Sequence, residues 1–236
     1  MRYLLGIDVG TTGTKTLLFR QDGRLMGHAY CPYDTQTPEV GWSEQNPNDW
    51  WNAVVQTVRQ VCADPAVAQK VAGISLSLQG GTTVPVDENF LPVRPAIVWN
   101  DNRCGQEHEA YLREVGPDIS IYEKTGGHLI YGGNALTIRW MKEHEPEHFA
   151  KTAMFLSVTD YISYKMTGIP AVDMSDVGIN QLGNIREGVY DQEILEFAGI
   201  TEEKLNHPGA VYLFRGVLLR LAFLILRFRR ELRVNQ

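Results

Sequence analysis

The stretch LLGIDVGTTGTKTLLF, residues 4–19, decides how the rest of this chain is interpreted. Two apolar runs flank a short turn made of Gly10, Thr11, Thr12 and Gly13, and this pattern predicts a β-hairpin. Glycine permits positive φ values and a close approach of the backbone, so the turn can offer N–H groups to an anion, with the threonine hydroxyls as further donors. A plain hairpin that needs glycine in its turn is the simpler interpretation.

Asp8 stands at the end of the first predicted strand, directly before the turn. Its carboxylate oxygens suit a divalent cation or the water around it. An acid beside a phosphate-binding loop is what magnesium–nucleotide chemistry requires, because the metal neutralises charge on the phosphates. We therefore predict that Asp8 binds a metal ion.

The hairpin resembles the first phosphate-binding loop of the actin/hexokinase superfamily, and most closely the opening of the FGGY carbohydrate kinases. The pattern D-x-G-T-[TS]-x-x-[KR] of these kinases is matched by Asp8, Gly10, Thr11, Thr12 and Lys15. The resemblance implies ATP and Mg²⁺ as cofactors. The cofactor-binding residues that it implies are Asp8, Gly10, Thr11, Thr12, Gly13 and Lys15, with Asp8 as the metal ligand.

Composition and charge exclude several other classes of protein. The chain has 236 residues and is 44% hydrophobic, which is ample for a buried core. Residues 211–236 hold six arginines and one glutamate, a local charge of +5. Since the whole chain has a net charge of −6, residues 1–210 carry a net charge of −11. An acidic body argues against nucleic-acid binding. Three widely spaced cysteines suit neither a disulfide framework nor a zinc site, and no signal peptide is visible, so we expect a cytoplasmic protein.

The order of the predicted elements indicates an α/β fold. A turn at Asp22-Gly23 leads into a third strand, Arg24 to Tyr30, and Asn46 is a suitable N-cap for a helix that begins at Pro47. Val71 to Leu78 reads as a buried strand of a parallel pair. Three successive strands followed by helices predict a ribonuclease H-like layer, the actin/hexokinase-type domain, with a mixed sheet and flanking helices.

Gln79, Gly80 and Gly81 follow this strand and are candidates for the floor of a crevice. A simple strand-to-strand turn explains them equally well. In the resembling kinases this loop contacts the sugar or polyol, after the same glutamine. Gly80 and Gly81 stand where xylulose kinases have Met-His and glycerol kinases have Arg-Glu, a departure that removes two hydrogen-bonding side chains and is expected to open space. The resemblance therefore does not imply which sugar is bound.

Later segments supply further candidate contacts. Asp101 and Arg103 lie in a stretch that resembles the W-x-D-x-R element of the family, and we expect them to shape the pocket, with a local ion pair as the alternative. Tyr131 and Asn134 lie in glycine-rich loops that correspond to the sugar site of the family. We expect Asp176 and its neighbour Ser175 to cap and brace a loop. The predicted substrate-binding residues are thus Gln79, Gly80, Gly81, Asp101, Arg103, Tyr131 and Asn134.

The resemblance covers residues 1–210, which we interpret as one N-terminal domain, and stops there. Residues 211–236 form a divergent, basic and apolar tail in place of the second, nucleotide-binding domain. A shifted reading frame is one explanation. The apolar run in the tail is far shorter than the roughly 20 residues that span a bilayer. A helix on a membrane surface, or packing on surface left bare by the missing domain, are the alternatives.

For the complete enzyme the resemblance implies transfer of the γ-phosphate of ATP to a hydroxyl of a pentulose-like sugar or polyol. The aspartate that acts as base in the family lies just beyond the end of the resemblance, and the last aspartate here is Asp191. We therefore identify no catalytic residue and expect this chain alone to be inactive. The alternative is a non-catalytic sugar-binding or interaction fragment. The expected partners are a small sugar or polyol and either a missing C-terminal half or a second copy of the chain.

Overall fold

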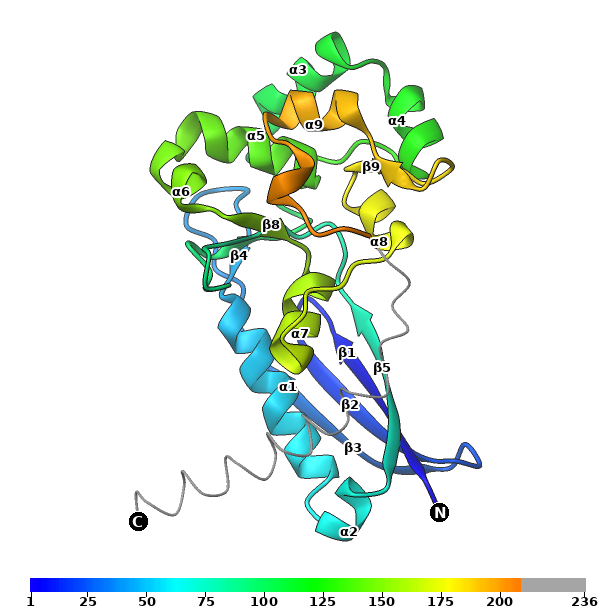
Figure 1. The fold of residues 1–236 in the computed structure, drawn as a ribbon. Helices are drawn as coiled ribbons and strands as arrows, with labels where there is room; N and C mark the ends of the chain where they lie inside the picture. The colour runs from blue at the N-terminus through cyan, green and yellow to red at the C-terminus, as the bar shows by residue number, and fades with distance from the viewer. Residues whose placement is uncertain (209–236) are drawn as a thin grey trace.

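A computed structural model describes residues 1–208, and Figure 1 shows their arrangement. A four-stranded sheet with helix α1 (Pro47–Val61) beside it occupies the lower half of the view. A mainly helical part that follows strand β5 (Val71–Leu78) occupies the upper half. The expectations for residues 211–236 lie outside the described residues.

The sheet confirms the predicted hairpin and the mixed strand directions. Its strand order is β3-β2-β1-β5. Strands β1 (Tyr3–Val9), β2 (Gly13–Arg20) and β3 (Leu25–Pro32) form an antiparallel meander, and β5 pairs in parallel with β1. In this register Asp8 lies between Lys15 of β2 and Ser77 of β5. The hairpin turn and the end of β5 therefore meet at one edge of the sheet.

Helix α1 covers one face of the sheet because its apolar residues recur at helical spacing. Trp50, Val54 and Val58 are buried against alternate residues of β1, among them Ile7. Each such side chain stabilises the fold by about 1.5–3 kcal/mol when it is fully buried. The start of the helix is as predicted: the Asn46 side chain accepts a hydrogen bond from the N–H of Asn48 at 3.1 Å, and Pro47 follows at the first position.

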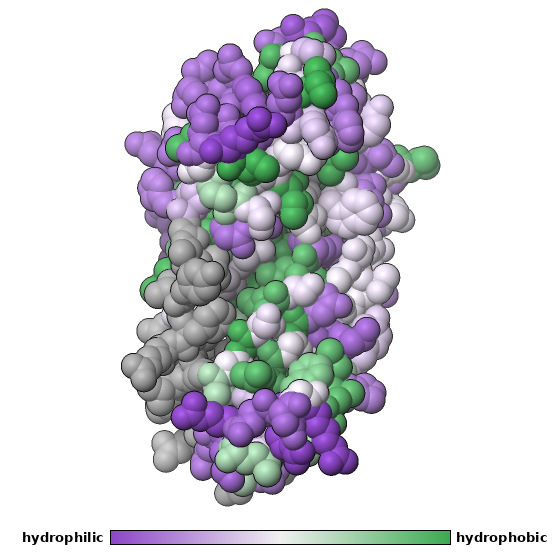
Figure 2. All heavy atoms as spheres, turned by 90° about the vertical axis from the view of Figure 1, so that its right-hand side faces the viewer, coloured by the Kyte–Doolittle hydropathy of each residue, from purple (hydrophilic) through white to green (hydrophobic). Residues whose placement is uncertain are grey.

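Strand β5 is only half buried, so the prediction of a buried strand was wrong for one of its faces. Ile74 is buried, whereas Ala72, Ser75 and Ser77 are exposed. The alternation of apolar and polar residues is typical of a strand with one covered face. Among residues 1–208, β5 is an edge strand, and Figure 2 shows apolar surface on this side of the molecule.

The upper part consists of short helices with three small two-stranded sheets, β4–β7, β6–β8 and β9–β10. Helix α2 (Pro65–Ala68) lies at the foot of β5 and is not in the upper part. The remaining helices are α3 (Gly105–Glu114), α4 (Asp118–Thr125), α5 (Asn134–His144), α6 (Pro146–Lys151), α7 (Val158–Thr167), α8 (Met174–Ile179), α9 (Gln192–Ala198) and the 3₁₀ turn Glu202–Lys204. Its strands are β4 (Glu44–Gln45), β6 (Val84–Val86), β7 (Ala96–Ile97), β8 (Met154–Leu156), β9 (Gly183–Asn184) and β10 (Val189–Tyr190).

The described residues have two clusters of buried apolar side chains. One joins the sheet to α1 and α7, and the other lies among α3, α5 and α9. That residues 1–210 are a single domain stays a prediction. No helix within residues 1–208 is long and apolar enough to cross a membrane.

Two buried carboxylates lie where α7 and α8 begin. Asp160 accepts hydrogen bonds from the N–H and the hydroxyl of Ser157, at 3.0 and 2.8 Å, in a capping box. Asp176, in the first turn of α8, is also buried, and one of its oxygens has no partner within the described part of the chain. Burial raises the pKa of Asp176 to about 6, and the charge of Asp160 adds to this rise, while a hydrogen bond from Ser157 opposes it.

We predict that Asp176 makes the protein less stable as the pH rises through about 6. Its pKa in the folded protein lies above the usual value of 3.8, so its favourable contribution is present below that value and is lost as pH rises. Asp176→Asn should therefore raise the free energy of unfolding at about pH 7.5 by about 1–2 kcal/mol relative to the unchanged chain, and by less at about pH 4. Urea unfolding at the two pH values measures this. The prediction is contradicted if Asp176→Asn changes the free energy of unfolding by the same amount at both pH values. Asp34→Asn, at an exposed position, is the matched control.

Candidate functional site

Side chains from the surrounding elements fix the backbone of the turn at Gly10–Gly13. The N–H of Gly10 donates to the carbonyl oxygen of Gly13 at 3.2 Å and closes the turn. The three carbonyl oxygens at its tip are held by bonds from Tyr33 to Gly10, from Gln45 to Thr11 at 2.6 Å and from Tyr30 to Thr12 at 3.0 Å. The N–H groups of Thr11 and Thr12 have no partner within residues 1–208, so they remain available to an anion.

Glycine at position 13 is favoured because there is little space beside it, and not because its backbone has a positive φ value. A Cβ atom at Gly13 would lie 2.5 Å from the hydroxyl oxygen of Tyr30 and equally close to its ring. Gly10 has ordinary space, and neither glycine has a positive φ value. The expectation of close backbone approach is thus confirmed at Gly13, and the expectation of positive φ is wrong for this turn.

Asp8 and Lys15 lie opposite each other beside the turn and are both exposed. Neither side chain makes a hydrogen bond or ion pair with another described residue. A free carboxylate, a free ammonium group and two free N–H groups within one turn fit a magnesium ion with phosphate oxygens. These residues could hold such a group without breaking an existing contact.

The loop at Gln79, which the sequence analysis predicts to be a crevice floor, adjoins this turn, and Gln45 connects the two. The N–H of Gln79 donates to the carbonyl oxygen of Val9 at 3.0 Å, and its side-chain amide donates to Gln45 Oε1 at 3.0 Å. Gln45 in turn donates to Thr11, and Trp50 donates to the same Gln45 oxygen at 2.9 Å. The side-chain oxygen of Gln79, Oε1, is buried without a partner among the described residues and is a free acceptor.

The glycines of the floor do not open the space that the sequence led us to expect. A Cβ atom at Gly80 would overlap Ile179 Cγ2, and one at Gly81 would lie 3.2 Å from Trp99 Cβ. Gly81 has a φ of +69°, which glycine adopts readily, and its N–H donates to Asn180 Oδ1 at 2.9 Å. The volume left by the two missing side chains is filled by an apolar wall.

The loop before α5 packs on Trp99 and lies beside Gly81. A Cβ atom at Gly132 would overlap the carbonyl group of Trp99, so this loop packs directly on the tryptophan. Tyr131 is exposed and stacks on His108, with the ring centroids 4.5 Å apart. Asn134 is buried at the start of α5, and its Oδ1 has no partner within residues 1–208.

Three residues that the sequence analysis did not select complete the site: Gln45, Trp99 and Asn180. Trp99 is 45% exposed, and its indole N–H donates to the hydroxyl of Thr11 at 3.2 Å. It therefore bridges the turn at Thr11 and the glycines at 80–81. The exposed tryptophan inside the W-x-D-x-R element was the available signal. Gln45 lies in the segment Trp42–Trp51, which resembles xylulose kinases but is explained equally well by a capped helix, and nothing local in the sequence marks Asn180.

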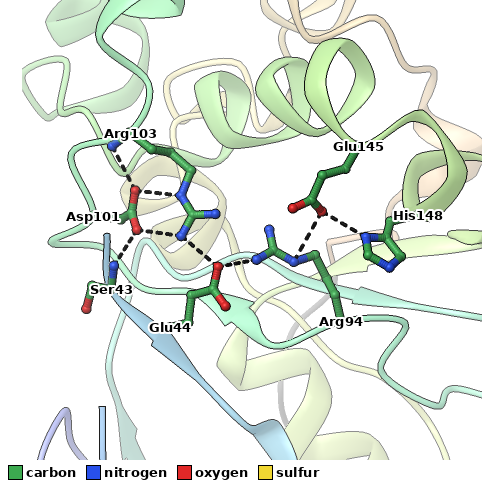
Figure 3. A network of polar contacts seen from close by, with 7 residues as sticks. All are labelled: Ser43, Glu44, Arg94, Asp101, Arg103, Glu145 and His148. Carbon is green, nitrogen blue, oxygen red and sulfur yellow. Dashed lines mark hydrogen bonds and ion pairs between the residues drawn. The ribbon is translucent and has the colours of Figure 1, made fainter. Parts of the chain in front are cut away.

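Asp101 and Arg103 lie behind the crevice in a buried ion network, which Figure 3 shows. Their side chains are 0% and 1% exposed. Arg103 donates to both oxygens of Asp101, at 2.9 and 2.8 Å, and to Glu44 at 2.8 Å. These contacts are the local ion pairing that the sequence left open, and a direct role of either residue in substrate binding stays a prediction.

The network extends beyond this pair. Asp101 also accepts from the N–H of Ser43 at 2.5 Å, and Glu44 also pairs with Arg94, which reaches Glu145 at 3.3 Å. The rings of Trp42 and Trp140 flank Arg103, with centroids 3.8 and 4.8 Å from its guanidinium carbon. Burial lowers the pKa of Arg103, but its bonds to Asp101 and Glu44 outweigh this and raise it above its usual value. The network fixes the segment that carries Trp99.

We predict that Asp101→Asn destabilises the chain strongly. The substitution keeps the shape of the side chain but removes one of the two carboxylates that pair with the buried Arg103, so that Arg103 and Arg94 share Glu44. Loss of one partner from a buried ion pair costs about 3–5 kcal/mol. Urea unfolding at neutral pH measures this loss. Asp34→Asn, at an exposed aspartate whose side chain makes no hydrogen bond or ion pair within residues 1–208, should change the stability by no more than about 0.5 kcal/mol. A loss below about 1 kcal/mol for Asp101→Asn would show that the network is not the support inferred from its geometry.

Comparison with known proteins gives consistent matches. The model of the "FGGY family of carbohydrate kinases, N-terminal domain" matches residues 3–208. Xylulose kinase of Bacillus subtilis is 32% identical over 204 residues, which are 86% of this chain and 40% of that protein. Gluconokinase of the same organism is 29% identical, with 86% and 39% covered. The chain spans about two fifths of the length of these relatives.

Solved structures agree with these matches. A xylulose kinase from Brucella ovis superposes with a TM-score of 0.81 at 28% identity, covering 88% of this chain and 43% of the other. A xylulose kinase from Rhodospirillum rubrum gives 0.82 at 25% identity, with the same coverage.

Proposed function

Because this chain belongs to the FGGY family of carbohydrate kinases, we propose that it forms the sugar- and phosphate-binding part of an enzyme that phosphorylates a hydroxyl of a sugar or polyol with ATP. The fold is that of sugar kinases of the actin/hexokinase type. Xylulose kinases among its relatives favour a pentulose-like substrate. The alternative, a non-catalytic sugar-binding or interaction fragment from a truncated or frameshifted gene, is not favoured by these matches.

One observation carries the proposal: Gln45 and Trp99 join the turn at Thr11 to the floor at Gln79–Gly81. A kinase must hold a phosphate and a hydroxyl side by side. The free N–H groups of Thr11 and Thr12 would donate hydrogen bonds to phosphate oxygens. Asp8 would hold the magnesium ion, and Lys15 would pair with the remaining negative charge of the phosphates. When bound, Mg²⁺ neutralises charge on the transferred phosphate.

The side chains around the proposed sugar-binding loop, Gln79–Gly81, favour a neutral substrate over a sugar acid. The wall over the floor is formed by Trp99, Ile130 and Ile179, which are partly exposed and apolar. The two arginines near this part of the fold, Arg94 and Arg103, are committed to buried carboxylates. Among residues 1–208 a carboxylate-bearing sugar would therefore meet no unpaired arginine beside this wall, whereas an indole ring suits the C–H face of a neutral sugar.

The group that accepts the proton from the sugar hydroxyl is proposed to come from outside these 236 residues. Asp101 is buried in the ion network, and Asp191 caps α9 and pairs with Lys124 at 3.0 Å. Asp8 belongs to the proposed metal site. We propose that a C-terminal half supplies the base and the rest of the nucleotide site, and that the protein works in the cytoplasm, where its three free cysteines stay reduced.

A chimera tests this function. Residues 1–208 joined to the C-terminal part of the Bacillus subtilis xylulose kinase should phosphorylate a pentulose in a coupled ATP assay, whereas the 236-residue chain alone should not. Asp8→Asn in the chimera should lower kcat at least about 100-fold, because the metal ligand is lost.

The matched control is Asp34→Asn, which should leave kcat unchanged. The proposal fails if a chimera that is folded by circular dichroism phosphorylates no pentulose, polyol or gluconate. It also fails if the Asp8→Asn chimera keeps full activity.

A further inference from the structure

Helices α3 and α5 bring Glu107, Glu143 and His144 together at the end of α5 that lies away from the crevice. The ligand atoms of the three side chains lie within 4.8 Å of one another. Asn134, at the crevice, and His144 are ten residues apart on this helix, or about 15 Å. We propose that these three residues form a binding site for a divalent transition-metal ion, separate from the proposed magnesium site at Asp8.

The spacing of the ligand atoms supports the proposal. Glu107 Oε1 and His144 Nε2 are 3.4 Å apart. Two ligands bound to one zinc ion at about 2.0–2.2 Å in tetrahedral geometry are also about 3.4 Å apart. Glu143 is the outer ligand, and its side chain is 47% exposed, so a rotation of this side chain closes the remaining distance.

The burial of Glu107 is the second observation. Its side chain is 2% exposed, and its Oε2 atom is buried without a hydrogen-bond partner among the described residues. A buried carboxylate is costly unless a cation or hydrogen bonds compensate it. Within residues 1–208 no lysine or arginine pairs with Glu107, and His144 is its one ionic partner. A divalent cation at Glu107 Oε1 would compensate the charge of this buried carboxylate.

The residues around the cluster hold the ligands in place. The ring of His144 stacks on Trp140, with centroids 5.1 Å apart, which limits its rotation. Arg139 binds Glu143 at 2.9 Å and Glu114 at 2.6 Å. Because Arg139 keeps Glu114 as a partner, Glu143 can turn toward the metal without leaving the guanidinium unpaired. Such supporting contacts orient metal ligands in proteins.

The ligand set indicates the class of metal. Two carboxylates and one imidazole suit Zn²⁺, Co²⁺ or Mn²⁺, whereas Ca²⁺ and Mg²⁺ prefer oxygen ligands alone. Since the ligands come from α3 and α5, the bound ion would cross-link these helices. We expect it to raise the melting temperature of the protein rather than to take part in phosphate transfer.

Titration of the metal-free 236-residue chain with Zn²⁺ tests the site by calorimetry, with Co²⁺ absorption as the spectroscopic readout. One ion should bind per chain and raise the melting temperature. Glu107→Gln and His144→Gln should each weaken binding at least about tenfold. His144→Gln changes a partly exposed residue, so it keeps the test valid if Glu107→Gln does not fold.

Glu109→Gln, at an exposed position of the same helix α3, is the matched control and should leave the affinity within about twofold. The proposal is overturned if no ion binds, or if the affinity in His144→Gln equals that of the unchanged chain. Because the readout is metal binding and not kinase activity, its outcome is independent of the proposed function.

Discussion

The side-chain amide of Gln45 is the contact on which the proposed site depends. Its N–H group binds the carbonyl oxygen of Thr11, and its oxygen receives hydrogen bonds from Gln79 and Trp50. One buried residue thus joins the turn at Gly10–Gly13, the loop at Gln79–Gly81 and helix α1. A buried amide with all of these partners satisfied stabilises a single arrangement of the loops, because any other arrangement would leave polar groups unpaired.

A second constraint fixes the segment that carries Trp99. Asp101, Arg103, Glu44 and Arg94 form a buried ion network behind the segment that presents Trp99. A buried network of this kind favours one geometry more than it adds stability, because desolvation offsets much of the attraction between the charges. The turn and the wall are therefore both fixed before any ligand binds. Such preorganisation is what positioning a phosphate beside a hydroxyl requires.

The fold could be predicted from the sequence wherever a local pattern decided it. The hairpin around Gly10–Gly13, the Asn46 cap and the parallel strand after α1 each follow from residues close in sequence. The prediction failed where a distant residue decided the outcome: Ile179 fills the space beside Gly80, and β5 keeps one face exposed. Asn180 could not be found in advance for the same reason, since its partner Gly81 is far away in the chain.

The central claim, that the turn and the glycine floor form one site, is tested most directly by nuclear magnetic resonance of the 236-residue chain. Magnesium with a non-hydrolysable ATP analogue and then D-xylulose would be added while the backbone amides are followed. The account predicts that the amides of Thr11 and Thr12 shift with the first ligand, and that those of Gly80 and Gly81 shift with the second. Shifts confined to other regions, or none in either loop at saturating ligand, would contradict it.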